Sequence, residues 1–282
     1  MNDPTTTTAT TATTDTTTVG LSGAAVGEYH RQGWASLGTI LDARDVDALL
    51  AACLAEQEPP PPDGRDESLF SYQKANGFEQ MFRRRTDLRL RHAGVAEVVR
   101  KLAPVAAALI GEDVRVLSDN TLSKPPAEEG SRATVWHQDF PFLPLDRRGV
   151  LTMWVALQDV AAESGALRFL PRSHRFGPIG RVELVGDEQG LEAILRPDEL
   201  AEVGEPVTTP VPRGGVTVHD GLLIHSALPN GSSAWRHAWT VRFMPASTRW
   251  TGAPIPIEGV EATILAPFST FDHPRFLVGS PD

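Results

Sequence analysis

The segment Trp136-His137-Gln138-Asp139-Phe140 lies near the middle of the chain, among short apolar segments that are rich in β-branched residues. Glycines and prolines separate these segments, which is typical of strands joined by turns. We expect strands over residues 114–122, 149–158, 166–170, 207–211, 215–219, 222–225 and 235–244. So many short strands in the second half of a chain predict a mainly β fold, a barrel or a sandwich.

The segments before residue 111 follow a helical pattern instead. Asp42 is a good N-cap, and apolar residues recur at helical spacing after it. A second helix is expected over residues 95–110, where Gly111 ends it, and a short helix over 26–34 and a strand over 36–41 come first. The β core is therefore expected to carry an N-terminal helical layer.

The chain of 282 residues shows no internal repeat and no long linker, so we expect a single domain over residues 21–282. Residues 1–20 are mostly threonine and cannot bury a core, which predicts a disordered tail. Residues 181–203 are acidic and interrupt the series of strands. We expect them to form an insertion over the barrel mouth, a candidate lid.

The composition excludes several classes of protein. A formal net charge of −10 argues against nucleic acid or an anionic membrane as partner. The single cysteine forms no internal disulfide, no apolar run is long enough to span a membrane, and no secretory signal is apparent. We expect a cytoplasmic protein that acts on a small molecule; the sequence does not predict its oligomeric state.

His137 and Asp139 are two residues apart, so a strand would project both side chains to the same face. Two histidines and one carboxylate around three open positions are typical of non-haem Fe(II) oxygenases. A surface His–Asp pair is the alternative, because the short motif alone is common. A metal site needs a third ligand from another strand.

Four downstream histidines are candidates for that ligand: His174, His219, His225 and His237. His225 is favoured, because it ends an apolar strand just before a turn, where a site at a barrel mouth is built. His174 follows a turn-like loop, and a structural role is expected for it. His219 shares a strand face with His225 only if Asp220-Gly221 does not break the strand.

Arg236 lies eleven residues after His225, on the strand that returns from the turn at Asn230-Gly231. An arginine inside a barrel needs a carboxylate partner, and an incoming dicarboxylate would supply it. A structural salt bridge is the alternative. Arg242 shares the strand face of Arg236, but we expect Arg236 to lie nearer the metal end of the barrel and Arg242 to act mainly in stability.

The order of these residues resembles the phytanoyl-CoA dioxygenase family of Fe(II)/2-oxoglutarate oxygenases. The resemblance extends over roughly residues 26–245. It includes the lysine–proline segment, the central strand, the glycine turn, the P-x-S-H loop and the distal histidine loop, at residues 123–126, 151–157, 163–167, 171–174 and 225–230.

The resemblance implies a double-stranded β-helix, the jelly-roll or cupin-like fold. It implies that His137, Asp139 and His225 hold Fe(II) and that Arg236 binds the distal carboxylate of the cosubstrate 2-oxoglutarate, with O2 as the oxidant. Asn120 and Trp154 fall where family members contact the cosubstrate. Many members carry Ser or Thr where this chain has Ala227, so Thr240 or Ser226 is expected to replace that hydroxyl.

The function expected from this resemblance is a dioxygenase of secondary metabolism that hydroxylates a small or medium natural product and releases succinate and CO2. The retained Asp139 favours oxygen chemistry over halogenation. Desaturation, cyclisation or epimerisation with the same cofactors is an alternative, as is a non-catalytic cupin-like binding protein. Arg236 argues against a zinc hydrolase. Side chains expected at the mouth are Phe140, Phe142, Trp136, Gln73 and Lys74.

Overall fold

The computed structural model describes residues 21–57, 81–180, 182, 184, 190–253 and 265–278. The threonine-rich segment 1–20 and two residues expected at the mouth, Gln73 and Lys74, lie outside this part of the chain. Within the described residues, no helix has the length and apolar character that crossing a membrane requires.

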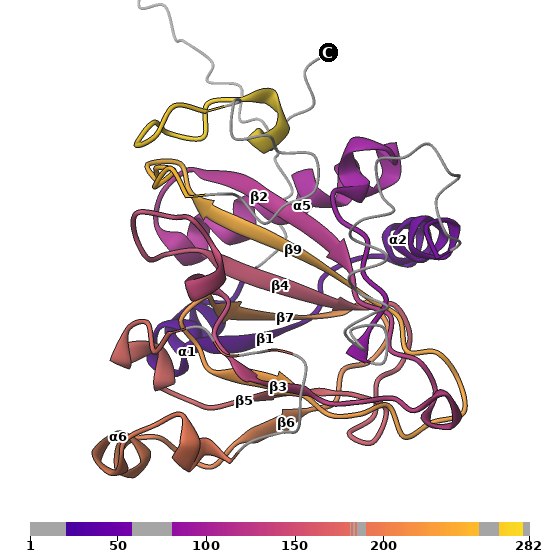
Figure 1. Cartoon of the computed structure of the whole chain (residues 1–282). Helices are drawn as coiled ribbons and strands as arrows, with labels where there is room; N and C mark the ends of the chain where they lie inside the picture. Colours follow the sequence, from indigo (N-terminus) through magenta and orange to yellow (C-terminus); the bar gives the residue numbers. More distant parts are fainter. Residues whose placement is uncertain are drawn as a thin grey trace, which may run out of the picture.

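Two antiparallel sheets form the body of the protein, with the minor sheet below the major sheet in Figure 1. The major sheet has the order β1-β7-β4-β9-β2, with bounds Trp34–Thr39, Gly215–Asp220, Leu151–Ala156, Ala238–Pro245 and Val114–Thr121. The minor sheet has the order β3-β8-β5-β6, with bounds Thr134–His137, His225–Ala227, Leu167–Phe169 and Val207–Thr209. Two facing sheets of this topology confirm the expected double-stranded β-helix class.

The major sheet presents two chemically different faces because side chains alternate along its strands. Leu151, Met153 and Val155 of β4 belong to a large apolar cluster with the helices. The intervening Thr152 and Trp154 line an internal cavity between the sheets. One face of the sheet therefore forms the core, and the other face forms the wall of a site.

The helical layer covers the core face of the major sheet, as expected. It consists of α1 (Gly23–Gln32), α2 (Ala43–Ala55) and α5 (Ala93–Ile110). Asp42 caps α2 by accepting a hydrogen bond from the Asp45 amide at 2.9 Å, and Gly111 ends α5 in the left-handed conformation. Their apolar faces bury Val46, Val99 and other residues against β4, β7 and β9.

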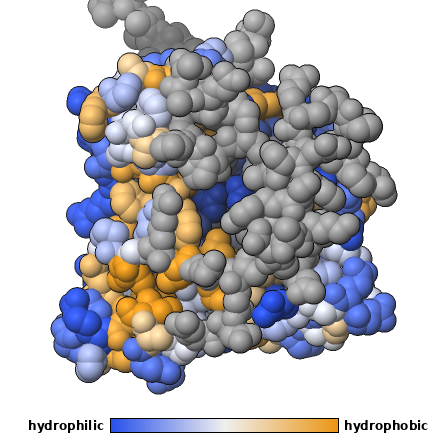
Figure 2. Space-filling model, viewed as in Figure 1, coloured by the Kyte–Doolittle hydropathy of each residue, from blue (hydrophilic) through white to orange (hydrophobic). Residues whose placement is uncertain are grey.

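The described part of the insertion, residues 182, 184 and 190–203, packs in part beside Trp136 of β3. It contains η5 (Leu191–Ala193) and α6 (Pro197–Glu202). Its Leu195 is buried with Trp136, Leu170 and Ile224. Figure 2 shows apolar side chains gathered on this part of the surface. Among the described residues of the insertion, Leu184 lines the internal cavity. The role of the insertion as a lid stays a prediction.

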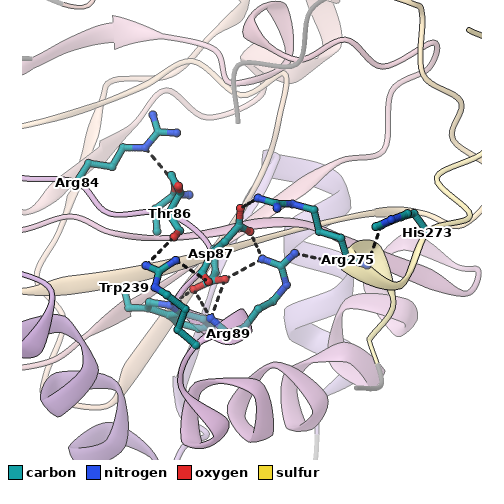
Figure 3. A network of polar contacts seen from close by, with 10 residues as sticks. Arg84, Thr86, Asp87, Arg89, Trp239, His273 and Arg275 are labelled. Atoms are coloured by element: carbon teal, nitrogen blue, oxygen red, sulfur yellow. Dashed lines mark hydrogen bonds and ion pairs between the residues drawn. The ribbon is translucent and has the colours of Figure 1, made fainter. Parts of the chain in front are cut away.

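A buried ionic network fastens the C-terminal segment to the core face of the major sheet (Figure 3). Arg89, in η1 (Leu88–Leu90), pairs with Asp87 and with Asp119 of β2, the latter at 2.9 Å. Asp87 also pairs with Arg275 in η6 (Pro274–Phe276), and Asp119 accepts a hydrogen bond from Trp239 Nε1 at 3.0 Å. Every charge in this network thus has an opposite charge beside it.

Candidate metal centre

Three side chains that the sequence singled out meet between the two sheets. His137 is the last residue of β3 and His225 the first of β8, and the two residues pair directly in the minor sheet. Their ring centroids are 4.2 Å apart. One ligand atom from each histidine and one from Asp139 lie within 4.8 Å of one another. We call His137, Asp139 and His225 the metal triad; their role as ligands stays a prediction.

The backbone places these residues differently from the sequence expectation. Asp139 is not on the strand with His137: it lies in the following turn, with φ −71° and ψ −43°, and begins the short helix η3 (Phe140–Phe142). His225 begins its strand rather than ending one, because residues 221–224 form a turn. A tight turn after β3, and not strand alternation, brings the carboxylate to the imidazoles.

Both histidines of the metal triad are oriented for metal binding. The Nδ1 atom of His137 lies 2.8 Å from the Val135 carbonyl oxygen, and that of His225 lies 3.0 Å from the Leu223 carbonyl oxygen. A carbonyl only accepts, so each Nδ1 carries the proton and each Nε2 keeps a lone pair. Burial lowers the pKa of His137 to about 3 and that of His225 to about 4, so both rings are neutral near pH 7.

The donor set fits a ferrous ion. Two neutral imidazole nitrogens and one carboxylate on one side of a site suit non-haem Fe(II). The pKa of Asp139 lies well below its ordinary value despite burial, because the Arg242 guanidinium stabilises the carboxylate. The ionised carboxylate and the free Nε2 atoms are the protonation states that a metal ion requires.

The carboxylate of Asp139 is held by residues from the major sheet that face the metal triad. Arg242 on β9 donates through Nη2 to Oδ1 at 3.0 Å and through Nε to Oδ2 at 3.3 Å. The Thr152 hydroxyl on β4 donates to Oδ2 at 2.7 Å. His219 on β7 brings its Nε2 to 3.6 Å from Oδ2, and its ring centroid lies 4.3 Å from that of His225.

These residues form one register row across the sheet, because Thr152 pairs with His219 on one side and with Arg242 on the other. Ser118 extends the row on β2 and also lines the cavity. The expected position of Arg242, far from the metal end of the barrel, is wrong. Arg242 contacts the carboxylate directly because β9, which begins two residues after Arg236, runs past the metal triad.

Arg236 lies in the same cavity and has no acidic partner among the described residues. Its side chain is 2% exposed, donates from Nη1 to the Leu122 carbonyl oxygen at 3.0 Å, and leaves Nε without a hydrogen bond. Burial lowers its pKa to about 10. Lys124 is buried nearby, and its pKa lies well below its ordinary value because of burial and then the charge of Arg236, so a negative charge at this end of the cavity would be favourable.

The cavity has a volume of about 230 Å³ and joins the metal triad to Arg236. Asn120, Trp154 and Thr240 line it, as do the apolar side chains Phe82, Leu122, Phe142, Leu143, Leu167 and Leu184. Of the aromatic residues expected at the mouth, Phe142 lines the cavity. Phe140 packs against another apolar cluster and Trp136 against the insertion.

Several hydroxyl groups line the cavity together with Ala227, and their replacement of the missing hydroxyl stays a prediction. Thr240 and Ser226 both line the cavity, but the Ser226 hydroxyl already accepts a hydrogen bond from Arg168 Nε at 2.9 Å. Thr134, which pairs with Ala227 across β3 and β8, also lines the cavity. Thr134 could not be singled out from the sequence, because its position opposite Ala227 depends on the register between β3 and β8.

Gln138 stands between two residues of the metal triad and points away from the cavity into the protein. Its side-chain nitrogen donates to the Leu222 and Gly177 carbonyl oxygens at 2.6 and 2.9 Å, and its side-chain oxygen accepts from the Ile179 amide at 2.9 Å. The other two histidine candidates, His174 and His237, do not line the cavity. His237 instead bonds the Ser123 hydroxyl at 2.9 Å.

The family model of phytanoyl-CoA dioxygenase (PhyH) matches residues 29–238. Similar curated proteins include phytanoyl-CoA dioxygenase domain-containing protein 1 of Mus musculus, 36% identical over 120 residues, and of Danio rerio, 33% identical over 147 residues. These alignments cover 41% and 47% of this chain and 40% and 45% of the relatives. The chain thus spans less than half the length of the curated relatives it matches.

Solved structures similar to this chain span nearly its whole length. One is the non-heme alpha ketoglutarate dependent carbocyclase SnoK from nogalamycin biosynthesis, with 26% identity, a TM-score of 0.70, and coverage of 91% of this chain and 96% of that one. Another is the epimerase SnoN in complex with Fe3+, alpha ketoglutarate and nogalamycin RO, with 25% identity, a TM-score of 0.70, and coverage of 90% and 96%.

Proposed function

Because the chain belongs to the phytanoyl-CoA dioxygenase family, we propose that it is an Fe(II)/2-oxoglutarate-dependent oxygenase that hydroxylates a small or medium, partly apolar natural product. In the overall reaction, O2 supplies one oxygen atom to a substrate C–H bond and one to 2-oxoglutarate, which becomes succinate and CO2. The observation that carries the proposal is one cavity lined both by a His-Asp-His donor set and by Arg236, a buried arginine with no acidic partner among the described residues.

The metal triad is the proposed iron site. His137 and His225 offer Nε2 lone pairs because their Nδ1 protons are bound to backbone carbonyls, and Asp139 offers an ionised carboxylate. Iron supplies, when bound, the activation of O2 that is coupled to decarboxylation of 2-oxoglutarate. The role of the protein is to fix the three donor atoms and to surround them with a cavity whose lining is largely apolar, which limits access of water.

The cosubstrate site is proposed from charge and shape. 2-Oxoglutarate is a dianion, and Arg236 is a buried cation with no acidic partner among the described residues. A guanidinium pairs with a carboxylate through two parallel hydrogen bonds, so the distal carboxylate would complete Arg236. Asn120, Trp154 and Thr240 line the same cavity and are proposed to orient the cosubstrate there.

A substrate with apolar surface is proposed from the remaining wall of the cavity. Phe82, Phe142, Leu143 and Leu184 supply apolar contact area. SnoK is a carbocyclase and SnoN an epimerase, and both are alpha ketoglutarate dependent enzymes of nogalamycin biosynthesis. Cyclisation or epimerisation is therefore the second candidate outcome for this chain.

The experiment is succinate release from 2-oxoglutarate, measured with Fe(II), ascorbate and O2 over a panel of natural-product scaffolds. We expect substrate-dependent succinate release from the wild-type protein and none from His225→Ala. Mass spectrometry of the product separates the outcomes, because hydroxylation adds 16 Da, desaturation or ring closure removes 2 Da, and epimerisation leaves the mass unchanged. Binding of a scaffold without succinate release would instead support a non-catalytic binding protein.

A further inference from the structure

The carboxylate of Asp139 already forms an ion pair with Arg242. Arg242 donates two side-chain hydrogen bonds to this carboxylate, one to each oxygen. Asp139 is also the one acidic residue among the described residues that line the cavity. A metal ion that binds Asp139 therefore shares its negative ligand with a guanidinium cation.

Two different roles of Arg242 are compatible with such contacts. A positioning role would hold the carboxylate in place, and its loss would weaken metal binding, as is usual for residues that support metal ligands. A counter-ion role would oppose the metal ion by charge, and its loss would strengthen metal binding. Thr152 separates the two roles, because its hydroxyl anchors Oδ2 at 2.7 Å without carrying charge.

The row across the sheet favours the counter-ion role. Thr152 donates to Asp139 from β4, His219 approaches it from β7, and the short turn after β3 fixes its backbone. The Thr152 hydroxyl keeps its hydrogen bond to the carboxylate when Arg242 is replaced, so we expect the carboxylate to stay in place and ionised. What a replacement by methionine removes is mainly one positive charge, in a site where charges are poorly screened.

We propose that Arg242 is a built-in counter-ion of Asp139 that competes with the bound metal ion and so sets a weaker metal affinity than the metal triad would have alone. The same positive charge attracts the dianionic cosubstrate. This second consequence rests on the proposed function, whereas the first does not. Loss of Arg242 should therefore change the two affinities in opposite directions, which loss of a merely positioning residue would not do.

The test measures Mn(II) binding to the metal-free protein in the absence of 2-oxoglutarate, by calorimetry and by the electron paramagnetic resonance signal of free Mn(II). Arg242→Met removes the charge and keeps the length of the side chain, and Arg242→Lys keeps the charge. Arg115→Met is the matched control, because it removes one charge from β2 at a residue that does not line the cavity. Circular dichroism and melting temperature establish folding, and Arg242→Gln replaces the methionine variant if that variant is unfolded.

We expect Arg242→Met to bind Mn(II) about tenfold more tightly than wild type, or tighter still, with Arg242→Lys and Arg115→Met within a few-fold of wild type. In the presence of saturating Mn(II), Arg242→Met should bind 2-oxoglutarate more weakly. Equal or weaker Mn(II) binding by Arg242→Met would overturn the proposal and leave Arg242 a positioning residue. Equal tightening in Arg115→Met would overturn it as well, as an effect of overall charge. Absence of 2-oxoglutarate binding in wild type would count against the proposed function alone.

Discussion

Replacing Arg236 by methionine should stabilise the protein and abolish binding of 2-oxoglutarate. The guanidinium is 2% exposed, has no acidic partner among the described residues and leaves its Nε without a hydrogen bond. Burial lowers its pKa well below the ordinary value of an arginine, to about 10. At about 1.4 kcal/mol for each tenfold change in equilibrium, this fall corresponds to roughly 3–4 kcal/mol.

The sign of the effect follows from the charged form. At neutral pH the arginine is below both its unfolded and its folded pKa, so the folded state carries the whole cost of the buried charge. Methionine removes that cost and also relieves Lys124, whose pKa is lowered by burial and further by Arg236. The Leu122 carbonyl oxygen keeps a second donor in the Ala238 amide at 3.3 Å. A gain approaching 3 kcal/mol would raise the melting temperature by roughly 6–12 °C.

The assay is thermal unfolding with and without 2-oxoglutarate, in the presence of Mn(II). In wild type, the cosubstrate at about 100 times its Kd should add about 2.7 kcal/mol of stability; in Arg236→Met this increment should vanish. Arg89→Met is the contrasting control, because Arg89 is equally buried but paired with Asp87 and Asp119, and its loss should destabilise by about 3–5 kcal/mol. A lower melting temperature for Arg236→Met, or an undiminished response to 2-oxoglutarate, would refute the reasoning.

Three further predictions use the same measurements. Alanine at any one position of the metal triad should remove the rise in melting temperature caused by Mn(II); an unchanged rise would remove that residue from the ligand set. Gly165→Ala should destabilise the protein by about 1–2 kcal/mol more than Gly130→Ala. Both glycines have positive φ, but only at Gly165 does an added Cβ meet other atoms, at 3.0 Å from Lys124 Cδ and 3.4 Å from Arg236 Nε, and equal losses would show that this contact is harmless. Burial and then Arg236 lower the pKa of His237 to about 4, so between pH 6.5 and 4 the unfolded chain binds more protons than the folded protein. Stability should therefore decrease as the pH is lowered through this range. His237→Gln should reduce that decrease in melting temperature, and an unchanged pH profile would contradict the prediction.

The fold was predictable because its signals are local. Strands such as Leu151–Ala156 carry β-branched and apolar residues between turn residues. Asp42 caps the start of α2, and Gly111 caps the end of α5. The family resemblance then supplied the sheet arrangement that such patterns leave open. The metal triad was singled out for the same reason: its members belong to ordered motifs and do not depend on a detailed register.

The row on the major sheet could not be predicted, because it depends on which residues of distant strands lie opposite one another. Thr152, His219 and Arg242 come from three strands that are far apart in sequence, and a shift of one residue would turn any of them to the helices. Alternation along the expected strand 235–244 did place Arg236 and Arg242 on one face. It gave no information on which of them lies beside Asp139, and the estimate from distance along the strand wrongly placed Arg242 far from the metal end.

The side chain of Gln138 makes the middle position of the H-x-D motif a constraint on evolution and on library design. Its amide joins the loop at 177–179 and the turn at 222 to the peptide that carries the two ligands. A randomised library at this position would keep the ligands themselves intact, yet most substitutions would leave buried backbone groups of both loops without partners. Functional survivors would therefore be few, and engineering of substrate range is better directed to apolar side chains of the cavity wall such as Leu184, which lie outside the ligand-bearing turn.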